Sequence, residues 1–241
     1  MTAALLIARR ELAAYLRTWS GYVIIAAMLL LDGLLFNAFA MGGSSKRSAE
    51  VIYQFFYFSS GVTITAAVFL SMRLLAEERQ TGTLSLLYSS PVTDAEIVIG
   101  KFLSALAFLS ILIVLTLYMP LLVLVNGKVS FGHLFAGYLG LLLLGAASVA
   151  IGTFGSSLAK NQVLAAILSG VIVVALLVCW MLSSVTDRPF SELFTALALH
   201  GKHFQPFGQG IVHVRDVIYY VAVTFVALFA AIRVLEARRW R

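Results

Sequence analysis

The sequence predicts an all-α membrane protein with several membrane-spanning helices. Of its 241 residues, 61% are hydrophobic and only 12% are charged. A soluble domain is roughly 45–50% apolar and about 25% charged, so this chain has too few polar residues to cover a soluble core. It also contains apolar runs as long as a bilayer-crossing helix. These observations argue against a water-soluble globular enzyme.

The composition also bounds the class of partner. The chain has four prolines and a single cysteine, Cys179, which argues against a disordered protein or one held together by internal disulfides. The net charge of +6 comes from Lys and Arg residues that lie mostly at the ends of apolar runs. This arrangement is typical of a membrane surface, and we expect lipid contacts and no nucleic-acid partner.

The first 18 residues predict an amphipathic helix on the membrane surface. We expect Leu5, Leu12 and Leu16 to face lipid, with Arg9, Arg10 and Arg17 towards the headgroups. The run that follows is too long for a signal peptide and contains Asp32, so we expect it to remain as the first span.

Six stretches reach the length of about 20 residues that a bilayer of about 30 Å requires. They form one transmembrane domain over residues 1–241, with spans at 19–41, 53–75, 97–125, 134–158, 163–185 and 217–235. Residues 76–96 form a charged loop, and residues 186–216 form a long loop that we expect to fold back as a hairpin before the last span.

The positive charges orient the chain. With six spans, eleven of the 17 Lys and Arg residues share one side with both termini: Arg9, Arg10, Arg17, Arg73, Arg79, Lys101, Lys160, Arg233, Arg238, Arg239 and Arg241. Because cytoplasmic loops carry the excess of Lys and Arg, both termini are expected in the cytoplasm.

The loop over residues 76–96 predicts a short cytoplasmic helix. Thr81 is suited to N-cap it, Gly82 allows a tight turn, and Pro91 ends it. Three side chains at i, i+3 and i+4 form its apolar stripe: Leu84, Leu87 and Tyr88. The pattern Thr93-x-x-Glu96 then predicts a capping box at the start of the third span. A helix this short normally leans on a partner.

These residues resemble the first cytoplasmic loop of ABC-2 type exporter permeases. The resemblance covers nearly the whole chain. It is carried by Ala8-Arg9-Arg10-Glu11, Glu77-Glu78-Arg79 through Pro91-Val92, Gly100-Lys101-Phe102, Gly137-Tyr138-Leu139-Gly140, Ser156-Ser157-Leu158, His203-Phe204, Arg215-Asp216-Val217 and the tail Val234-Leu235-Glu236. The set is similar to the gliding-motility branch of these permeases, which is close to the permease for nitrous oxide reductase maturation.

The resemblance implies a dimer of permease chains, as a homodimer or with a related permease, together with separate ATP-binding subunits. It also implies a place in a bacterial inner membrane, and it leaves open whether an accessory subunit with a periplasmic domain joins the complex. The residues expected at the ATPase contact are Glu77, Glu78, Arg79, Thr81, Gly82 and Thr83, with Leu84, Leu87 and Tyr88 filling its groove before Pro91. The alternative is that these charges only anchor a loop at the lipid surface.

The chain itself has no expected catalytic role. A P-loop requires Gly-x-x-x-x-Gly-Lys-Ser/Thr, and none of the three Gly-Lys pairs fits this spacing. We therefore expect ATP and Mg²⁺ on the partner subunit and no cofactor on this chain. Two other functions stay open: an ATPase-driven device that transmits force or regulates a partner, and an ion-coupled secondary carrier.

Asp32 lies near the middle of the first span, where an Asp costs about 2.5–3.5 kcal/mol on insertion scales. It should therefore face protein or water, either in the cargo path or gate, or in a structural hydrogen bond to Ser59, Ser60 or Thr63. Asn37 is expected at the membrane interface, with a place in the cargo path or gate as the alternative.

The outer loop contains several aromatic and imidazole side chains. Phe204 and Phe207 are expected, by resemblance, near the exit of the cargo path. His200, His203 and His213 lack a Cys or carboxylate to complete a first shell, so no metal site is expected. In the fourth span, Gly145, Val149, Gly152 and Ser156 recur every three or four positions, which favours close helix packing.

Overall fold

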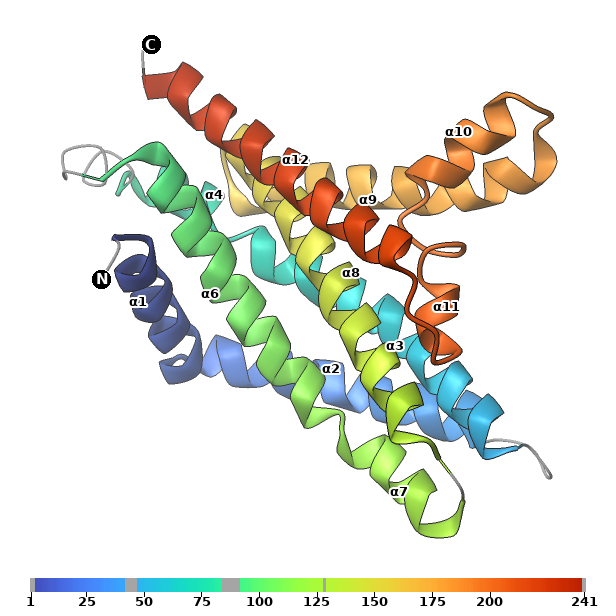
Figure 1. Ribbon diagram of the computed structural model, residues 1–241. Coiled ribbons are helices and arrows are strands. Elements are labelled where there is room, and N and C mark those ends of the chain that lie inside the picture. Colours follow the sequence, from blue (N-terminus) through green and yellow to red (C-terminus); the bar gives the residue numbers. More distant parts are fainter. Residues whose placement is uncertain (1–2, 42–46, 84–91, 128, 240–241) are drawn as a thin grey trace.

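The computed structural model describes residues 3–41, 47–83, 92–127 and 129–239, and in these ranges helices joined by turns and short loops are the regular structure. Figure 1 shows the arrangement, with both termini at the same end of the molecule as α4. In chain order the elements are α1 (Ala3–Arg17), α2 (Trp19–Leu35), η1 (Phe36–Ala40), α3 (Ser48–Ser71), α4 (Ala76–Thr81), α6 (Asp94–Leu115), α7 (Tyr118–Asn126), α8 (Phe131–Leu158), α9 (Gln162–Val185), α10 (Phe190–Leu197), α11 (Gln205–Gly208) and α12 (Val214–Arg239).

Six stretches of the described chain are long and apolar enough to cross a membrane, as the sequence predicts. They are Gly21–Ala40, Ser48–Thr81, Asp94–Val125, Phe131–Leu158, Gln162–Val185 and Val214–Arg238. The second, third, fourth and sixth begin three to five residues before the predicted starts, because their first turns continue the helix into polar sequence.

Three of the spans are not regular helices from end to end, since the second has a turn at residues 72–75 between α3 and α4. The first ends in a π-helical turn, η1. The third breaks after Leu115, where the backbone N–H groups donate to the third residue back in place of the fourth. Thr116 donates both its backbone N–H and its hydroxyl to the carbonyl of Ile113. The hydroxyl bond is 2.7 Å long. A side chain that binds its own backbone in this way competes with the helix ladder, so the span continues as a separate helix, α7.

Helix α8 is the central element of the bundle. It packs against α3, α6, α9, α11 and α12, and 67% of its most apolar stretch is buried. The predicted small-residue stripe lies at these contacts. A Cβ on Gly145 would lie 2.7 Å from the Leu109 side chain, and one on Gly152 would lie 1.8 Å from Ser71 Oγ. Only glycine allows the helices to approach this closely.

The expected lipid-facing side of α1 is wrong in part. Leu5 is exposed, but Leu12 and Leu16 are partly buried against the main apolar core. The reason is that α1 packs along α6, where Gly100 leaves room for the α1 backbone, and Tyr15 packs against Phe108 with ring centroids 5.2 Å apart. The helix is therefore part of the bundle as well as of its surface.

The loop between the last two spans folds back onto the bundle. Helix α10 packs on α9, and α11 packs on α8 and α3 (Figure 1). Tyr220 of α12 donates to the carbonyl of Leu199 over 2.9 Å, and Leu199 N–H donates to the carbonyl of Leu176 over 3.2 Å. A folded-back hairpin at residues 186–216 agrees with the sequence expectation.

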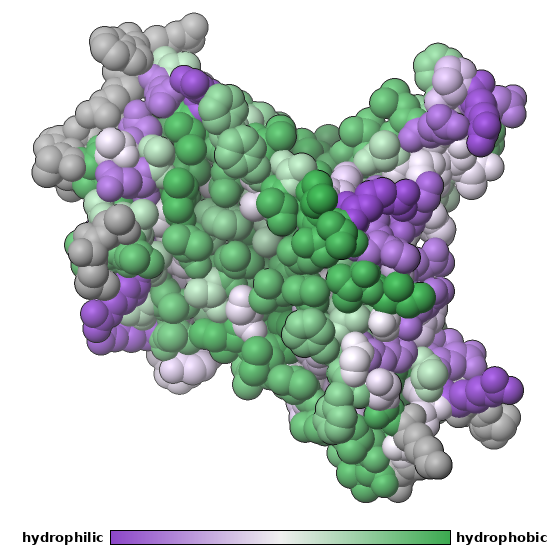
Figure 2. Space-filling model, viewed as in Figure 1, coloured by the Kyte–Doolittle hydropathy of each residue, from purple (hydrophilic) through white to green (hydrophobic). Residues whose placement is uncertain are grey.

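The surface fits a membrane environment. Figure 2 shows a broad hydrophobic face over the middle of the molecule, with hydrophilic residues gathered towards opposite ends. Large apolar side chains on α9 and α12 are exposed, among them Ile167, Val171, Phe225 and Phe229. An exposed apolar surface of this kind would favour aggregation in water, but it is normal for helices that contact lipid tails.

Candidate functional site

Helix α4 is mounted on the C-terminal end of α8. Because the first N–H groups of any helix have no partner inside it, they need an acceptor from elsewhere. Here Ser156 Oγ of α8 accepts from the N–H of Leu75 at 3.1 Å and from the N–H of Ala76 at 3.0 Å. A residue 80 positions further along the chain thus satisfies the start of α4.

Arg79 makes the reciprocal connection. Its guanidinium donates to the carbonyl of Ala159 and, over 3.2 Å, to that of Ser157. Arg238 of α12 donates to the neighbouring carbonyl of Leu158 over 2.9 Å. The free carbonyls and the negative dipole end of α8 are therefore covered by two cations. Arg79, expected at the ATPase contact, is half-buried in this internal role.

The two glutamates of α4 point in different directions. Glu78 forms an ion pair with Lys101 of α6, with 2.7 Å between Nζ and Oε1, and its side chain is only 14% exposed. Glu77 pairs with Arg73 on the preceding turn, at 2.9 Å, and is more exposed. Glu78 therefore faces the bundle, while Glu77 lies nearer the surface.

The exposed part of this region begins where α4 ends. Thr81, expected to cap the start of a helix, is instead the last residue of α4, and its hydroxyl donates to the carbonyl of Glu77 over 3.0 Å. Gly82 ends the helix in the left-handed conformation, with φ at 74°. Thr81, Gly82 and Thr83 are all exposed. Leu84, Leu87, Tyr88 and Pro91 lie outside the described residues.

The capping box after this loop is confirmed. Thr93 Oγ1 accepts from the N–H of Glu96 at 3.3 Å, and the Glu96 carboxylate accepts from the N–H of Thr93 at 3.0 Å. The start of α6 is therefore fixed locally, independently of what the loop before it does.

Beside α4 lies a charged cavity of about 150 Å³. Its polar lining comes from α1, from the end of the second span and from α6: Glu11, Tyr15, Thr18, Arg73, Glu77, Glu78 and Lys101. Burial raises the pKa of the Tyr15 phenol, so the phenol keeps its proton and donates to the carbonyl of Leu70 over 3.3 Å.

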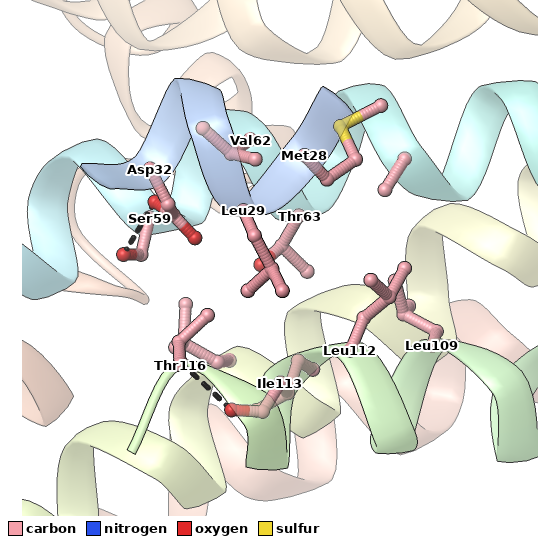
Figure 3. Close-up of a pocket in the computed structure, with 12 residues that line it drawn as sticks. Met28, Leu29, Asp32, Ser59, Val62, Thr63, Leu109, Leu112, Ile113 and Thr116 are labelled. Carbon is pink, nitrogen blue, oxygen red and sulfur yellow. Dashed lines mark hydrogen bonds between the residues drawn. The ribbon is translucent and has the colours of Figure 1, made fainter. Parts of the chain in front are cut away.

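A second polar region surrounds Asp32 (Figure 3). Asp32 is 6% exposed and accepts a hydrogen bond of 2.8 Å from Ser59 Oγ, one of the three partners proposed from the sequence. The cavity next to them is lined mainly by apolar side chains of α2, α3, α6 and α8 and has a volume of about 20 Å³, enough for one water molecule. Asn37, by contrast, is exposed on η1.

Comparison with protein families agrees with this architecture. The family model described as "ABC-2 family transporter protein" matches residues 5–238, nearly the entire chain. The chain belongs to this family. It is therefore the membrane component of an ABC transporter, a multi-pass protein that works with an ATP-binding subunit. No curated protein matches the chain.

In this ABC-2 protein the aromatic residues expected near the exit are core residues of the chain. Phe207 is fully buried beside Gly140 of α8, where a Cβ would lie 2.5 Å from the Phe207 Cβ. Phe204 is 2% exposed and stacks on His200, with ring centroids 5.1 Å apart. Both side chains anchor the outer loop onto the bundle.

The outer-loop histidines of the ABC-2 chain have separate surroundings. His200 lies 2.8 Å from Ser60 Oγ, whereas His203 is buried against Asp216, with 2.7 Å between Nδ1 and Oδ1. His213 is exposed. Within the described ranges, no three His, Cys, Asp or Glu side chains are placed to hold a metal ion.

Sequence reasoning missed two residues that hold α4. Lys101 is counted from the sequence with the cations of the cytoplasmic side, yet its side chain is 2% exposed. Ser156 was expected only as a small packing residue, yet it holds the start of α4. The signal for Lys101 was its place inside an apolar span next to Gly100, since a buried cation requires an acidic partner.

Proposed function

We propose that this chain is the permease subunit of an ATP-driven exporter and acts as a dimer with a second permease chain. The region around α4 would receive the motion of the ATP-binding subunit. The single observation that supports this most is the mounting of α4: Ser156, Arg79 and Lys101 bind it to α8 and α6, while Thr81, Gly82 and Thr83 stay exposed.

This division gives the expected contact residues two roles. Thr81, Gly82, Thr83 and the apolar stripe Leu84, Leu87 and Tyr88 would contact the ATP-binding subunit, with Pro91 ending the segment. Glu78 and Arg79 would pass its displacement into the bundle, because their charges are already bound to α6 and α8. A surface helix attached only to lipid could not transmit such a push.

The location follows from the same proposal. The face that holds α4 and both termini would be cytoplasmic, and the chain would lie in a bacterial inner membrane. The ATP and Mg²⁺ would be bound by the partner, which supplies the catalysis. The exposed apolar faces of α2 and α9 would be covered by lipid and by the second permease copy. The similarity to the gliding-motility branch supports an accessory subunit with a periplasmic domain.

A crosslinking experiment tests the proposal. In a Cys179→Ser background, Thr83→Cys should crosslink to a co-expressed ATP-binding subunit in intact membranes, and the two should co-purify. Lys202→Cys, exposed in the outer loop, is the matched control and should not crosslink. Crosslinks from both positions, or from neither, would refute the assignment of this face.

Export itself needs a separate assay. Inverted membrane vesicles that contain the complex should take up substrate on addition of ATP, with lipid-linked and peptide cargo candidates compared in turn. ATP hydrolysis that responds to a periplasmic partner without any uptake would instead favour a force-transmitting device.

A further inference from the structure

One buried ammonium group joins three helices at the face that holds α4. Lys101 lies on α6, and its side chain is 2% exposed. Its Nζ is 2.7 Å from Oε1 of Glu78 on α4 and 3.5 Å from Oε1 of Glu11 on α1. Because a buried charge is costly unless it is paired, these two carboxylates determine where the ammonium can rest.

The pairing is unequal. One cation faces two carboxylates, and only Glu78 is at the distance of a strong charge-assisted hydrogen bond. The second oxygen of Glu78, Oε2, is buried and accepts no hydrogen bond from the described part of the chain. Glu11 also pairs with Arg10, whose side chain is 67% exposed, at 3.0 Å. The group thus has one strong bond and one weaker alternative.

There is room for the alternative to form. The cavity of about 150 Å³ is lined by all three groups, so a Lys side chain with four rotatable carbons can shift towards Glu11 without displacing packed side chains. The neighbouring Arg73 is bound to Glu77, since both its Nε and its Nη2 donate to that carboxylate.

We propose that Lys101 is the residue that couples displacement of α4 to α1 and α6, by exchanging its short ion pair between Glu78 and Glu11. The inference rests on the proposed function, in which α4 is pushed by the ATP-binding subunit. When α4 moves away, Lys101 keeps a carboxylate partner by drawing closer to Glu11, so the relative position of α1 and α6 changes. Such an element has two discrete arrangements, which is what transmission between distant sites requires.

The test measures whether nucleotide binding is sensed at the far end of the bundle. The complex with its ATP-binding subunit is placed in nanodiscs, in a Cys179→Ser background. The reporter is Gln209→Cys, exposed at the end of α11. Its labelling rate with a maleimide is compared with and without ATP and vanadate, and the ratio of the two rates is the readout.

Three variants distinguish coupling from simple stability. Lys101→Met should bring the labelling ratio to about one while the ATP-binding subunit still co-purifies. Glu78→Gln should reduce the ratio partially. The exchange Lys101→Glu with Glu78→Lys restores an ion pair between α4 and α6 but places the cation on α4, which carries it away from α6 and α1 when α4 moves. It should therefore restore stability and leave the ratio near one, whereas a residue needed only for folding would recover the response.

Arg233→Met is the control, because Arg233 forms an exposed pair with Glu236 on α12 and should leave the ratio unchanged. A full response in Lys101→Met, or full recovery in the charge exchange, would overturn the inference. If Lys101→Met does not accumulate, Glu78→Gln and the exchange decide. Failure of the unmodified chain to bind an ATP-binding subunit, or to respond to ATP, would instead refute the proposed function.

Discussion

At the scale of single residues, the carboxylate of Asp32 depends on Ser59. Removing the hydroxyl leaves a buried carboxylate without its donor, which costs about 1–3 kcal/mol. Ser59→Ala should therefore lower the melting temperature of the purified protein by several degrees, whereas Asp32→Leu combined with Ser59→Ala should lower it less than Ser59→Ala alone.

Ser184→Ala is the matched control for this prediction. Its hydroxyl lies on the exposed side of α9 and bonds only to the carbonyl of Met181 in the same helix. Equal losses for Ser59→Ala and Ser184→Ala would show that the Asp32 bond contributes nothing to stability.

His200 gives the protein a pH-dependent stability. Burial lowers the pKa of His200 to about 4, compared with about 6.5 in an unfolded chain. The unfolded chain binds the proton more tightly than the folded chain. The free energy of unfolding is therefore highest above about pH 6.5 and decreases as the pH falls towards 4. The melting temperature should decrease over this range, and His200→Gln should decrease less steeply.

His213→Gln serves as the comparison, because His213 is exposed and should leave the slope unchanged. The direction of the hydrogen bond between His200 and Ser60 also follows from the contacts of Ser60. Ser60 donates to the carbonyl of Tyr57 over 2.6 Å, so the Nε2–H of His200 donates to Ser60 Oγ. If His200→Gln and the unmodified protein show the same pH profile, the imidazole does not govern acid stability.

At the scale of elements, the support of α4 by α8 can be tested with two adjacent serines. Ser156→Ala removes the acceptor for two backbone N–H groups, so it should loosen α4 at a cost of about 1–3 kcal/mol. Hydrogen exchange at residues 75–83 should then accelerate. Ser157 is equally buried but donates only to Phe154 of its own helix, so Ser157→Ala should have little effect there.

The spans themselves could be predicted from sequence, because length and hydropathy alone determine whether a helix can cross a bilayer. The capping box at Thr93 could also be predicted, because it depends only on two residues three positions apart in the sequence. The break at Thr116 was not, because threonine is tolerated in many helices. The prediction of which side of α1 faces lipid was wrong, because the packing of α1 on α6 depends on Gly100, which is far along the chain.

The candidate site could be predicted only in outline. The charged loop over residues 76–96 stands out from its composition, but the partners of its side chains do not. Ser156 and Lys101 lie some 20 to 80 residues from α4 in the sequence, and no local periodicity indicates that they meet it. Pairings of this kind follow from the packing of whole helices.

At the scale of the whole molecule, the proposed orientation predicts which residues face each side of the membrane. Lys160 lies beside the end of α8 that holds α4, and Lys202 lies in the outer loop; both are exposed. With Cys179→Ser as background, an impermeant maleimide added to intact cells should label Lys202→Cys after the outer membrane is permeabilised. Lys160→Cys should be labelled only in inverted vesicles, and labelling of the two from the same side would contradict six spans.

The continuity of α8 limits how the two faces can communicate. It is a single helix of 28 residues, about 42 Å long at 1.5 Å per residue. Its last turn holds α4 through Ser156, and Gly140 in its first half holds Phe207 of α11. A helix with an unbroken ladder of hydrogen bonds resists both bending and stretching, so α8 moves as a rigid rod. A displacement at one end would therefore reach the other as a shift or a tilt of the whole helix, and the contacts with neighbouring helices would set the pivot point.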